Sequence, residues 1–316
     1  EAVSVAWGDF AKPLWFSEIE PFPCAVLAHH YPNVTNFGDM RNLPERIINR
    51  EIPAPDVLVG GTPCQAFSIA GKRESLNDER GNLTLVLIQI LEAIDSVRAA
   101  DGKAPCVLIW ENVPGVLSAK DNAFGCLLGG LVGEFEPLQP AGGKWTGAGY
   151  VHSPKRNIAW RILNAQFFGV PQSRRRIFLV ASAGRVSAAK ILFEQKSLCG
   201  DIKTSERERE NITGFIEAGF AQYRQSEIGG TLRASGGALG GGSETIVVQD
   251  GYKARKLTPI ECERLQGFPD NYTRIPFRSK AAENCPDSHR YKAIGNSMAV
   301  PVMRWIGNRL FKTIKN

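Results

Sequence analysis

A cysteine lies in a short loop rich in glycine and proline, at residues 60–65 (GGTPCQ). Glycine and proline shape turns in which the backbone can approach a ligand, so Cys64 is displayed at a turn. A thiol in such a place acts as a nucleophile when nearby cations or dipoles favour the thiolate. The alternative for an unpaired cysteine is a small buried apolar side chain, the role we expect for Cys24, Cys106 and Cys126.

A glutamate follows the apolar run 106–110 (CVLIW) and opens the sequence ENVP at residues 111–114. A carboxyl group at a strand end beside an apolar wall is partly desolvated, which favours its protonated form. Glu111 is therefore a candidate proton donor. An exposed carboxylate in a turn is the alternative.

Consecutive arginines occupy residues 174–176, within the sequence QSRRR at the start of another apolar run. Side chains alternate along a strand, so Arg174 and Arg176 point to one side and Arg175 to the other. Two guanidinium groups on one side suit a planar acceptor or phosphate groups. A solvated basic strand end is the alternative.

Short apolar runs of strand length recur along the chain, at residues 13–17, 57–59, 106–110 and 176–180. Between them, residues 83–97 (LTLVLIQILEAIDSV) have the length and apolar stripe of a helix packed on a core. Continuous apolar strands that alternate with helices indicate a parallel sheet covered on both faces. The sequence therefore predicts an α/β fold with a doubly wound, mostly parallel sheet.

Three of the predicted strands end at reactive or polar residues, namely Glu18, the pair Pro63 and Cys64, and Glu111. Ligands of doubly wound folds bind beyond the carboxyl ends of the strands. We therefore expect the functional site at this edge of the sheet.

Residues 182–253 differ in composition from the rest of the chain, because they are rich in glycine, serine and charged residues. This composition predicts a smaller region of turns and short strands, and a flexible linker is the alternative. Residues 291–314 return to a helical apolar pattern.

The composition excludes several classes of protein. Of 316 residues, 43% are hydrophobic and 22% charged, which is enough to bury a core and excludes wholesale disorder. No apolar run reaches the length of about 20 residues that a membrane span needs, and no signal peptide is visible at the start. Seven scattered cysteines without a CxxC pair argue against a disulfide framework or a zinc site, so we expect a cytoplasmic protein.

The net charge of +6 is unevenly distributed. Residues 137–193 contain no Asp or Glu but many Lys and Arg residues, whereas residues 1–60 are acidic overall. The segment 274–315 is basic again. This separation is expected when one face binds a polyanion, and solvated surface charges are the alternative.

Five segments, in this order, resemble the motifs of the cytosine-C5 DNA methyltransferase family in its prokaryotic or phage form. They are PCQ at 63–65, ENV at 111–113, Q-x-R-x-R at 172–176, RKLTPIECERLQGF at 255–268 and YKAIGNS at 291–297. Each short motif alone would be weak, but five in register are specific. The resemblance extends from Glu18 to about Met303.

The resemblance implies a Rossmann-like, S-adenosylmethionine-dependent methyltransferase fold. Residues 1–181 with 286–316 would form the catalytic, cofactor-binding domain, and residues 182–285 a small, mainly β or irregular target-recognition domain. The implied reaction is methylation of cytosine at C5 in double-stranded DNA, with the target base flipped out of the duplex. Cys64 would form a covalent bond to C6 of that base.

The same resemblance implies roles for the site residues. Glu111 would bind or protonate cytosine N3, Arg176 would hold the O2 edge, and Arg174 would support it nearby. For the cofactor, Glu18 would accept hydrogen bonds from the ribose hydroxyls, and Asp39 would read the adenine amino group. The implied cofactor-binding residues are Glu18, Ile19, Asp39, Met40, Pro63, Leu83, Asn296 and Ser297. For Leu83, which would pack on the purine, a purely structural place in its apolar helix is the alternative.

The expected partner is double-stranded DNA, bound in a salt-dependent way by the acid-free stretch. A cognate restriction endonuclease is a possible further partner, and we expect a monomer. Methylation of cytosine in tRNA and a catalytically inactive DNA-binding protein are the alternative functions.

Two departures from the family pattern stand out. The chain begins at Glu1, just past the position of the family's F-x-G-x-G loop, so the loop is expected either upstream of this numbering or to be missing. Thr62 stands where many relatives carry Phe, which leaves less aromatic surface beside the cytosine. The stretch 140–150, which contains Trp145, resembles an insert to which the sequence assigns no role.

Overall fold

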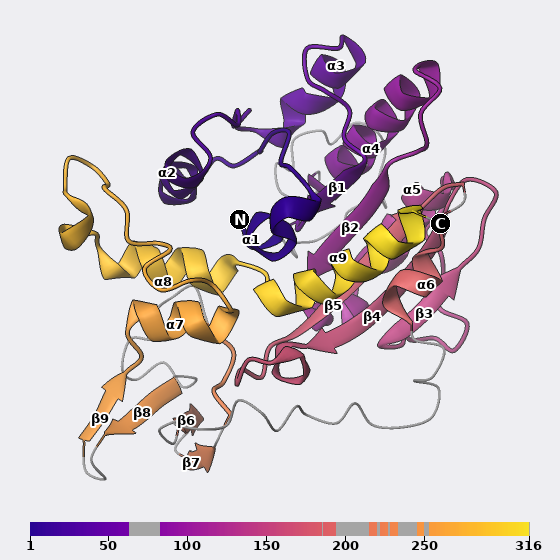
Figure 1. The fold of residues 1–316 in the computed structure, drawn as a ribbon. Helices are drawn as coiled ribbons and strands as arrows, with labels where there is room; N and C mark the ends of the chain where they lie inside the picture. The colour runs from indigo at the N-terminus through magenta and orange to yellow at the C-terminus, as the bar shows by residue number, and fades with distance from the viewer. Residues whose placement is uncertain are drawn as a thin grey trace.

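The computed structural model describes residues 1–62, 83–184, 186–193, 215–219, 222–226, 228–232, 245–249 and 253–315. Two sheets are present in this part of the chain (Figure 1). The five-stranded sheet has the order β1-β2-β5-β4-β3, formed by Val57–Gly60, Val107–Asn112, Arg175–Ser182, Asn157–Asn164 and Ala148–Val151. The four-stranded sheet has the order β7-β6-β8-β9, formed by Gln222–Ser226, Phe215–Gly219, Thr245–Gln249 and Lys253–Lys256.

The five-stranded sheet is mixed, and the prediction of a mostly parallel sheet is wrong for its described strands. Only β1 and β2 pair in parallel, while β2–β5, β5–β4 and β4–β3 are antiparallel. The physical reason lies in the connections. A parallel pair needs a crossover of a dozen or more residues, and α4 (Leu83–Ala100) supplies one between β1 and β2. The short link 165–174 instead folds β5 back against β4.

The predicted strand at residues 13–17 is absent. This segment forms a single parallel bridge, between Phe16 and Asn36. Phe16 N donates to Thr35 O, and Phe37 N donates to Phe16 O. The segment therefore lies extended beside residues 35–37 and does not join the sheet.

Helices cover both faces of the five-stranded sheet, as the continuous apolar strands predicted. In β2, Val107 and Ile109 contribute to one buried cluster, whereas Leu108 and Trp110 contribute to the other. The first cluster includes residues of α1 (Ala2–Trp7), α2 (Pro21–His30), α6 (Ala188–Leu192) and α9 (Val300–Lys315). The second includes residues of α3 (Leu43–Ile48), α4 and α5 (Ala123–Val132). Figure 1 shows α9 lying across the sheet on the first of these faces.

The insert-like stretch 140–150 has a packing role that the sequence did not reveal. The Trp145 ring makes edge-on contacts with Phe124 and Trp160, at centroid distances of 5.3 and 5.8 Å. Trp145 Nε1 donates to Asn122 Oδ1. The stretch thus covers the aromatic side chains beside α5.

The smaller sheet is followed in the chain by two helices, α7 (Pro259–Gln266) and α8 (Asp287–Asn296), which lead to α9 on the larger sheet. Strand β9 is followed by α7, which packs on α8. Figure 1 places α7 between the smaller sheet and α8. Helix α6 falls within the predicted recognition domain, yet it packs against β4, β5 and α9. The predicted domain boundaries, 182 and 285, stay a prediction.

Within the described part of the chain, no helix has both the length and the hydropathy needed to span a bilayer.

Candidate active site

An ion pair joins the ends of two neighbouring strands. Glu111 in β2 lies directly opposite Phe178 of β5, so the two side chains share a face of the sheet. Arg176 lies two residues before Phe178 and therefore projects from that same face. Its Nε atom is 3.1 Å from Glu111 Oε1, and both side chains are largely buried, at 16% and 12% exposed.

The Glu111 carboxylate is desolvated, and one of its oxygens has no hydrogen bond to the described residues. Burial raises its pKa above the ordinary value, and the charges of Arg174 and Arg176 only partly oppose this effect. Glu111 Oε1 is buried, and despite its closeness to Arg176 it has no hydrogen-bond partner among the described residues. Burial also lowers the pKa of Arg176. A carboxyl group with a raised pKa beside a guanidinium can hold or deliver a proton and bind a polar ring edge.

The loop that leads to Cys64 starts beside Glu111. A side chain on Gly61 would place its Cβ 3.1 Å from Glu111 O and 3.5 Å from Oε2, so this close approach leaves little room for a larger residue. Asn112 Nδ2 donates to Thr62 O, which ties the loop to the end of β2. Pro63 and Cys64 themselves lie outside the described residues, and their predicted roles stay predictions.

Thr62 has a buried structural role. Its hydroxyl accepts a hydrogen bond from Trp110 Nε1 at 3.0 Å and shares another with Thr84 Oγ1 at 2.8 Å. These bonds connect the start of the loop to β2 and α4. No sequence pattern indicated this role; a buried tryptophan N–H needs an acceptor, and Thr62 is the residue that supplies it.

Arg174 is placed differently from Arg176. The alternation along β5 is as predicted, because Arg175 is exposed while its two neighbours are not. Arg174 is 3% exposed, and its guanidinium donates to the carbonyl oxygens of Leu232, Gly295 and Ser297. Burial lowers its pKa to about 10. Its contacts are thus with backbone, and its predicted part in catalysis is untested.

A cavity of about 1280 Å³ opens beside the end of β1. Its wall combines the segment 13–18, the loop 60–62, helix α4 and the turn between α8 and α9. The predicted cofactor residues found on this wall are Glu18, Met40, Asn296 and Ser297. The predicted residues Ile19, Asp39 and Leu83 are described but do not line it.

Glu18 is held firmly on the cavity wall. Its Oε1 accepts hydrogen bonds from Ile19 N and Glu20 N, both at 2.8 Å. Asn36 binds the Glu18 backbone on both sides, since Oδ1 accepts from Glu18 N and Nδ2 donates to Glu18 O. Glu18 Oε2 has no partner among the described residues. Asn36 is a positioning residue that no sequence pattern indicated.

The other predicted cofactor residues have local roles in the structure. Asp39 Oδ1 accepts from Arg41 N and caps the short helix that begins at Met40. Ile19 is 70% exposed, so its side chain is available to a flat ligand surface. Leu83 is the first residue of α4, and Leu87 of the same helix lines the cavity.

A family model described as C-5 cytosine-specific DNA methylase matches residues 5–198 and 200–312. The chain belongs to this family. The membership confirms the resemblance drawn from the five motifs and, at the level of the family, the predicted class of DNA cytosine methyltransferase.

Relatives of known name agree with the family, with one instructive exception. Two Type II methyltransferases, M1.ScrFI of Lactococcus lactis subsp. cremoris and M.SsoII of Shigella sonnei, are 29% and 27% identical to the chain. These matches cover 96% and 98% of this chain and 73% and 74% of those proteins. A protein of Escherichia phage P1, named DNA N-6-adenine-methyltransferase, is 36% identical. That match covers 99% of this chain but only 60% of the phage protein.

Solved structures support the fold. The crystal structure of the S. pombe Dnmt2 methyltransferase matches with a TM-score of 0.64 and 18% identity, covering 100% of this chain and 95% of that chain. A prophage-encoded putative DNA modification methyltransferase of E. coli matches with a TM-score of 0.57 and 15% identity, over 99% and 96%. The Rossmann-like α/β methyltransferase fold is therefore confirmed, with a mixed sheet.

Proposed function

We propose that the chain transfers a methyl group to C5 of cytosine in double-stranded DNA, using S-adenosylmethionine. The observation that carries this proposal is the buried Glu111–Arg176 pair beside the loop that leads to Cys64. Glu111 has a raised pKa and an oxygen without a hydrogen-bond donor among the described residues. The N4 amine of a cytosine would donate to this oxygen, and the protonated carboxyl group would in turn donate to N3.

In the proposed reaction, the Cys64 thiolate adds to C6 of a cytosine that has left the duplex. Glu111 donates its proton to N3, which removes negative charge from the ring as the thiolate adds. Arg176 holds O2 and stabilises the charge that develops there. S-adenosylmethionine supplies the methyl group that C5 takes up. Transfer of the C5 proton to water, with return of the N3 proton to the Glu111 carboxylate, then releases Cys64 as thiolate and restores the aromatic ring.

The cavity suits a nucleoside cofactor. Glu18 presents a fixed carboxylate whose Oε2 is open to vicinal hydroxyl groups, and Phe16, Met40 and Leu87 provide apolar surface nearby. Asn296 and Ser297 add polar groups to the same wall. A pocket that is mostly apolar with a few fixed polar groups is typical of small-molecule sites.

We further propose duplex DNA as the macromolecular partner, bound through the exposed cations of the acid-free stretch 137–193, such as Lys144, Arg175 and Lys190. Since M1.ScrFI and M.SsoII are named Type II methyltransferases, a cognate restriction endonuclease is the second partner class we propose. A monomeric state is part of the same proposal.

Adenine N6 methylation is the competing function, because the phage P1 relative carries that name. A substantial part of that protein lies outside the match, so its named activity need not reside in the matched part. The exocyclic amine of adenine is itself a nucleophile and needs no thiol adduct. The motif around Cys64 together with Glu111 and Arg176 therefore favours cytosine.

Product analysis separates these functions. The protein is incubated with isotopically labelled S-adenosylmethionine and duplex DNA or tRNA, and the digested nucleic acid is analysed by mass spectrometry. We expect label in 5-methylcytosine from duplex DNA and none with the variant Cys64→Ala. Label in N6-methyladenine, or only in tRNA, contradicts the proposal.

A second experiment tests the covalent step. Fluorine at C5 cannot leave as a proton does, so a duplex that contains 5-fluorocytosine should keep the bond between Cys64 and C6. We expect a protein–DNA adduct that survives denaturation and is absent for Cys64→Ala. Efficient methylation of ordinary DNA without such an adduct would argue against the thiol mechanism.

A further inference from the structure

The turn between α8 and α9 forms part of the cavity wall and is held by buried side chains from two directions. It carries Asn296 and Ser297, both on the wall. From one side, Arg174 Nη2 donates to Gly295 O at 2.9 Å and to Ser297 O at 2.8 Å. From the other side, Gln266 Nε2 donates to Ile294 O at 3.0 Å and more weakly to Ser297 O at 3.4 Å.

Both side-chain hydrogen bonds of Gln266 to the described residues go to this turn. Its side chain is fully buried, at the last position of α7. Both of its partners are acceptors, so the amide must present its nitrogen to them. Its Oε1 is buried without a hydrogen-bond partner among the described residues. A buried oxygen without a hydrogen bond is unfavourable, and the two hydrogen bonds that the nitrogen makes offset this cost.

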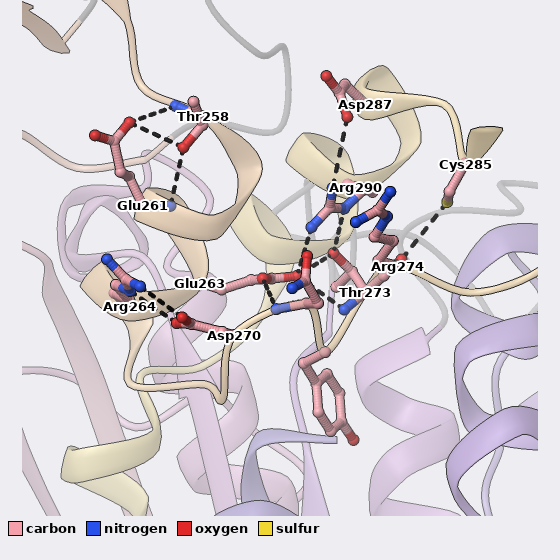
Figure 2. A network of polar contacts seen from close by, with 12 residues as sticks. Thr258, Glu261, Glu263, Arg264, Asp270, Thr273, Arg274, Cys285, Asp287 and Arg290 are labelled. Atoms are coloured by element: carbon pink, nitrogen blue, oxygen red, sulfur yellow. Dashed lines mark hydrogen bonds and ion pairs between the residues drawn. The ribbon is translucent and has the colours of Figure 1, made fainter. Parts of the chain in front are cut away.

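The same turn is the meeting point of three functional elements. Arg174 immediately precedes β5, which carries Arg176, and its Nη1 also donates to Leu232 O, in the segment between β7 and β8. Helix α7 follows β9 of the smaller sheet directly. It is fixed to α8 by the buried pair of Glu263 and Arg290, as Figure 2 shows.

We propose that Gln266 is a positioning residue for the cofactor, which acts together with Arg174 as a carbonyl clamp on residues 294–297. The clamp (Arg174 and Gln266) sets the backbone from which Asn296 and Ser297 face the cavity. It also links the cavity to the strand of Arg176 and to the smaller sheet. The inference rests on the proposed function, because it takes S-adenosylmethionine as the ligand of the cavity.

The first test is cofactor binding by Gln266→Met, which keeps the length of the side chain and removes its donor. We expect the Kd for S-adenosylmethionine, measured by calorimetry, to rise about tenfold, because two weak hydrogen bonds to the turn are lost. At saturating cofactor, kcat should change little, so the KM for the cofactor carries the effect.

A matched control is Ser182→Ala, which removes another buried side chain-to-carbonyl hydrogen bond, from Ser182 Oγ to Val186 O. This bond lies away from the turn, so the Kd should stay at the wild-type value. An equal rise in both variants, or no rise in Gln266→Met, overturns the inference.

The double variant Arg174→Lys with Gln266→Met tests whether the two side chains act together. Both bind Ser297 O, so their effects on Kd should not add. Strict additivity would overturn the clamp.

Amide hydrogen exchange tests the clamp without any cofactor, so its outcome does not depend on the proposed function. If the wild-type protein binds no S-adenosylmethionine, the proposed function fails, but the clamp still predicts faster amide exchange at residues 295–299 in Gln266→Met than in Ser182→Ala. Identical exchange in the two variants overturns it.

Discussion

Two glutamate–arginine pairs in the described part of the chain, Glu263–Arg290 and Glu111–Arg176, are largely buried but differ in how completely their hydrogen bonds are satisfied. Glu263 in α7 is 0% exposed and Arg290 in α8 is 5% exposed. Figure 2 shows their network, in which Glu263 accepts bonds from Asn271 N, Thr273 N, the Thr273 hydroxyl and Arg290. Glu111, by contrast, has an oxygen without a hydrogen-bond donor among the described residues and a raised pKa.

The difference separates a structural pair from a candidate catalytic pair. Every oxygen of Glu263 is engaged by the loop and helix around it, so the pair fixes α7 to α8. Glu111 has a neighbouring cation, but its Oε1 has no hydrogen-bond donor in the described part of the chain, an arrangement that is unfavourable in the absence of a ligand. A buried charged group with a missing hydrogen bond is expected where a bound substrate supplies that bond.

The largest expected effect is the loss of methyl transfer in Glu111→Gln. The amide keeps the shape of the side chain but cannot deliver a proton to cytosine N3, so single-turnover transfer should fall by roughly 10²- to 10⁴-fold. The Tm should remain close to that of the wild type. The matched change Glu263→Gln should show the reverse, with a lower Tm and a nearly normal rate per folded molecule. A rate for Glu111→Gln close to that of the wild type would remove the distinction between the two pairs.

A smaller expected effect, on stability, comes from Glu263→Ala. The change leaves the Arg290 charge buried with only the exposed Asp287 carboxylate nearby, at 3.6 Å, which should lower the free energy of unfolding by about 3 kcal/mol. Urea denaturation measures this loss. The double variant Glu263→Ala with Arg290→Met should recover part of it, because the uncompensated charge is gone. No recovery would mean that the backbone bonds to Asn271 and Thr273 matter more than the charge.

The sequence predicted the candidate catalytic pair better than the structural one. Alternation along residues 174–176 and the strand end at Glu111 are local patterns, and the structure contains both. The contact of Arg176 with Glu111 depends on the register of β2 against β5, which neither pattern contains. The strand directions could not be read in this way, because they depend on the connection between β4 and β5. Partners far apart in the sequence, such as Gln266 with Ile294, leave no periodic signal.

At the predicted cofactor site, too, the sequence indicated residues with a motif but not the residues that hold them through distant contacts. Glu18 and Ser297 were assigned to it by motif, and both line the cavity. Asn36, which holds Glu18, and Thr62, which holds the loop start, each act through two side-chain hydrogen bonds to residues distant in the sequence. Such bonds depend on the three-dimensional packing, which residue types and spacing do not specify.

The smallest expected effect concerns a third carboxylate, Glu261, which lies near the surface and is richly bonded. It closes a capping box with Thr258 at the start of α7 and forms two hydrogen bonds to Arg255. Arg255 first, and Thr258 after it, lower its pKa from 4.5 to about 2. Because the folded-state pKa is lowered, the stability from this group is present above pH 4.5 and is lost as the pH falls towards about 2.

Glu261→Gln should therefore lower the free energy of unfolding by about 0.5 kcal/mol at neutral pH, because the amide keeps the acceptor of the capping box but loses the ion pair with Arg255. The difference from the wild type should shrink as the pH falls through that window, which urea midpoints at several pH values would measure. A constant difference would show that the charge of Glu261 is immaterial and that the cap acts through shape alone. In that case, the number of hydrogen bonds, and not the charge, would distinguish Glu261 and Glu263 of α7 from Glu111.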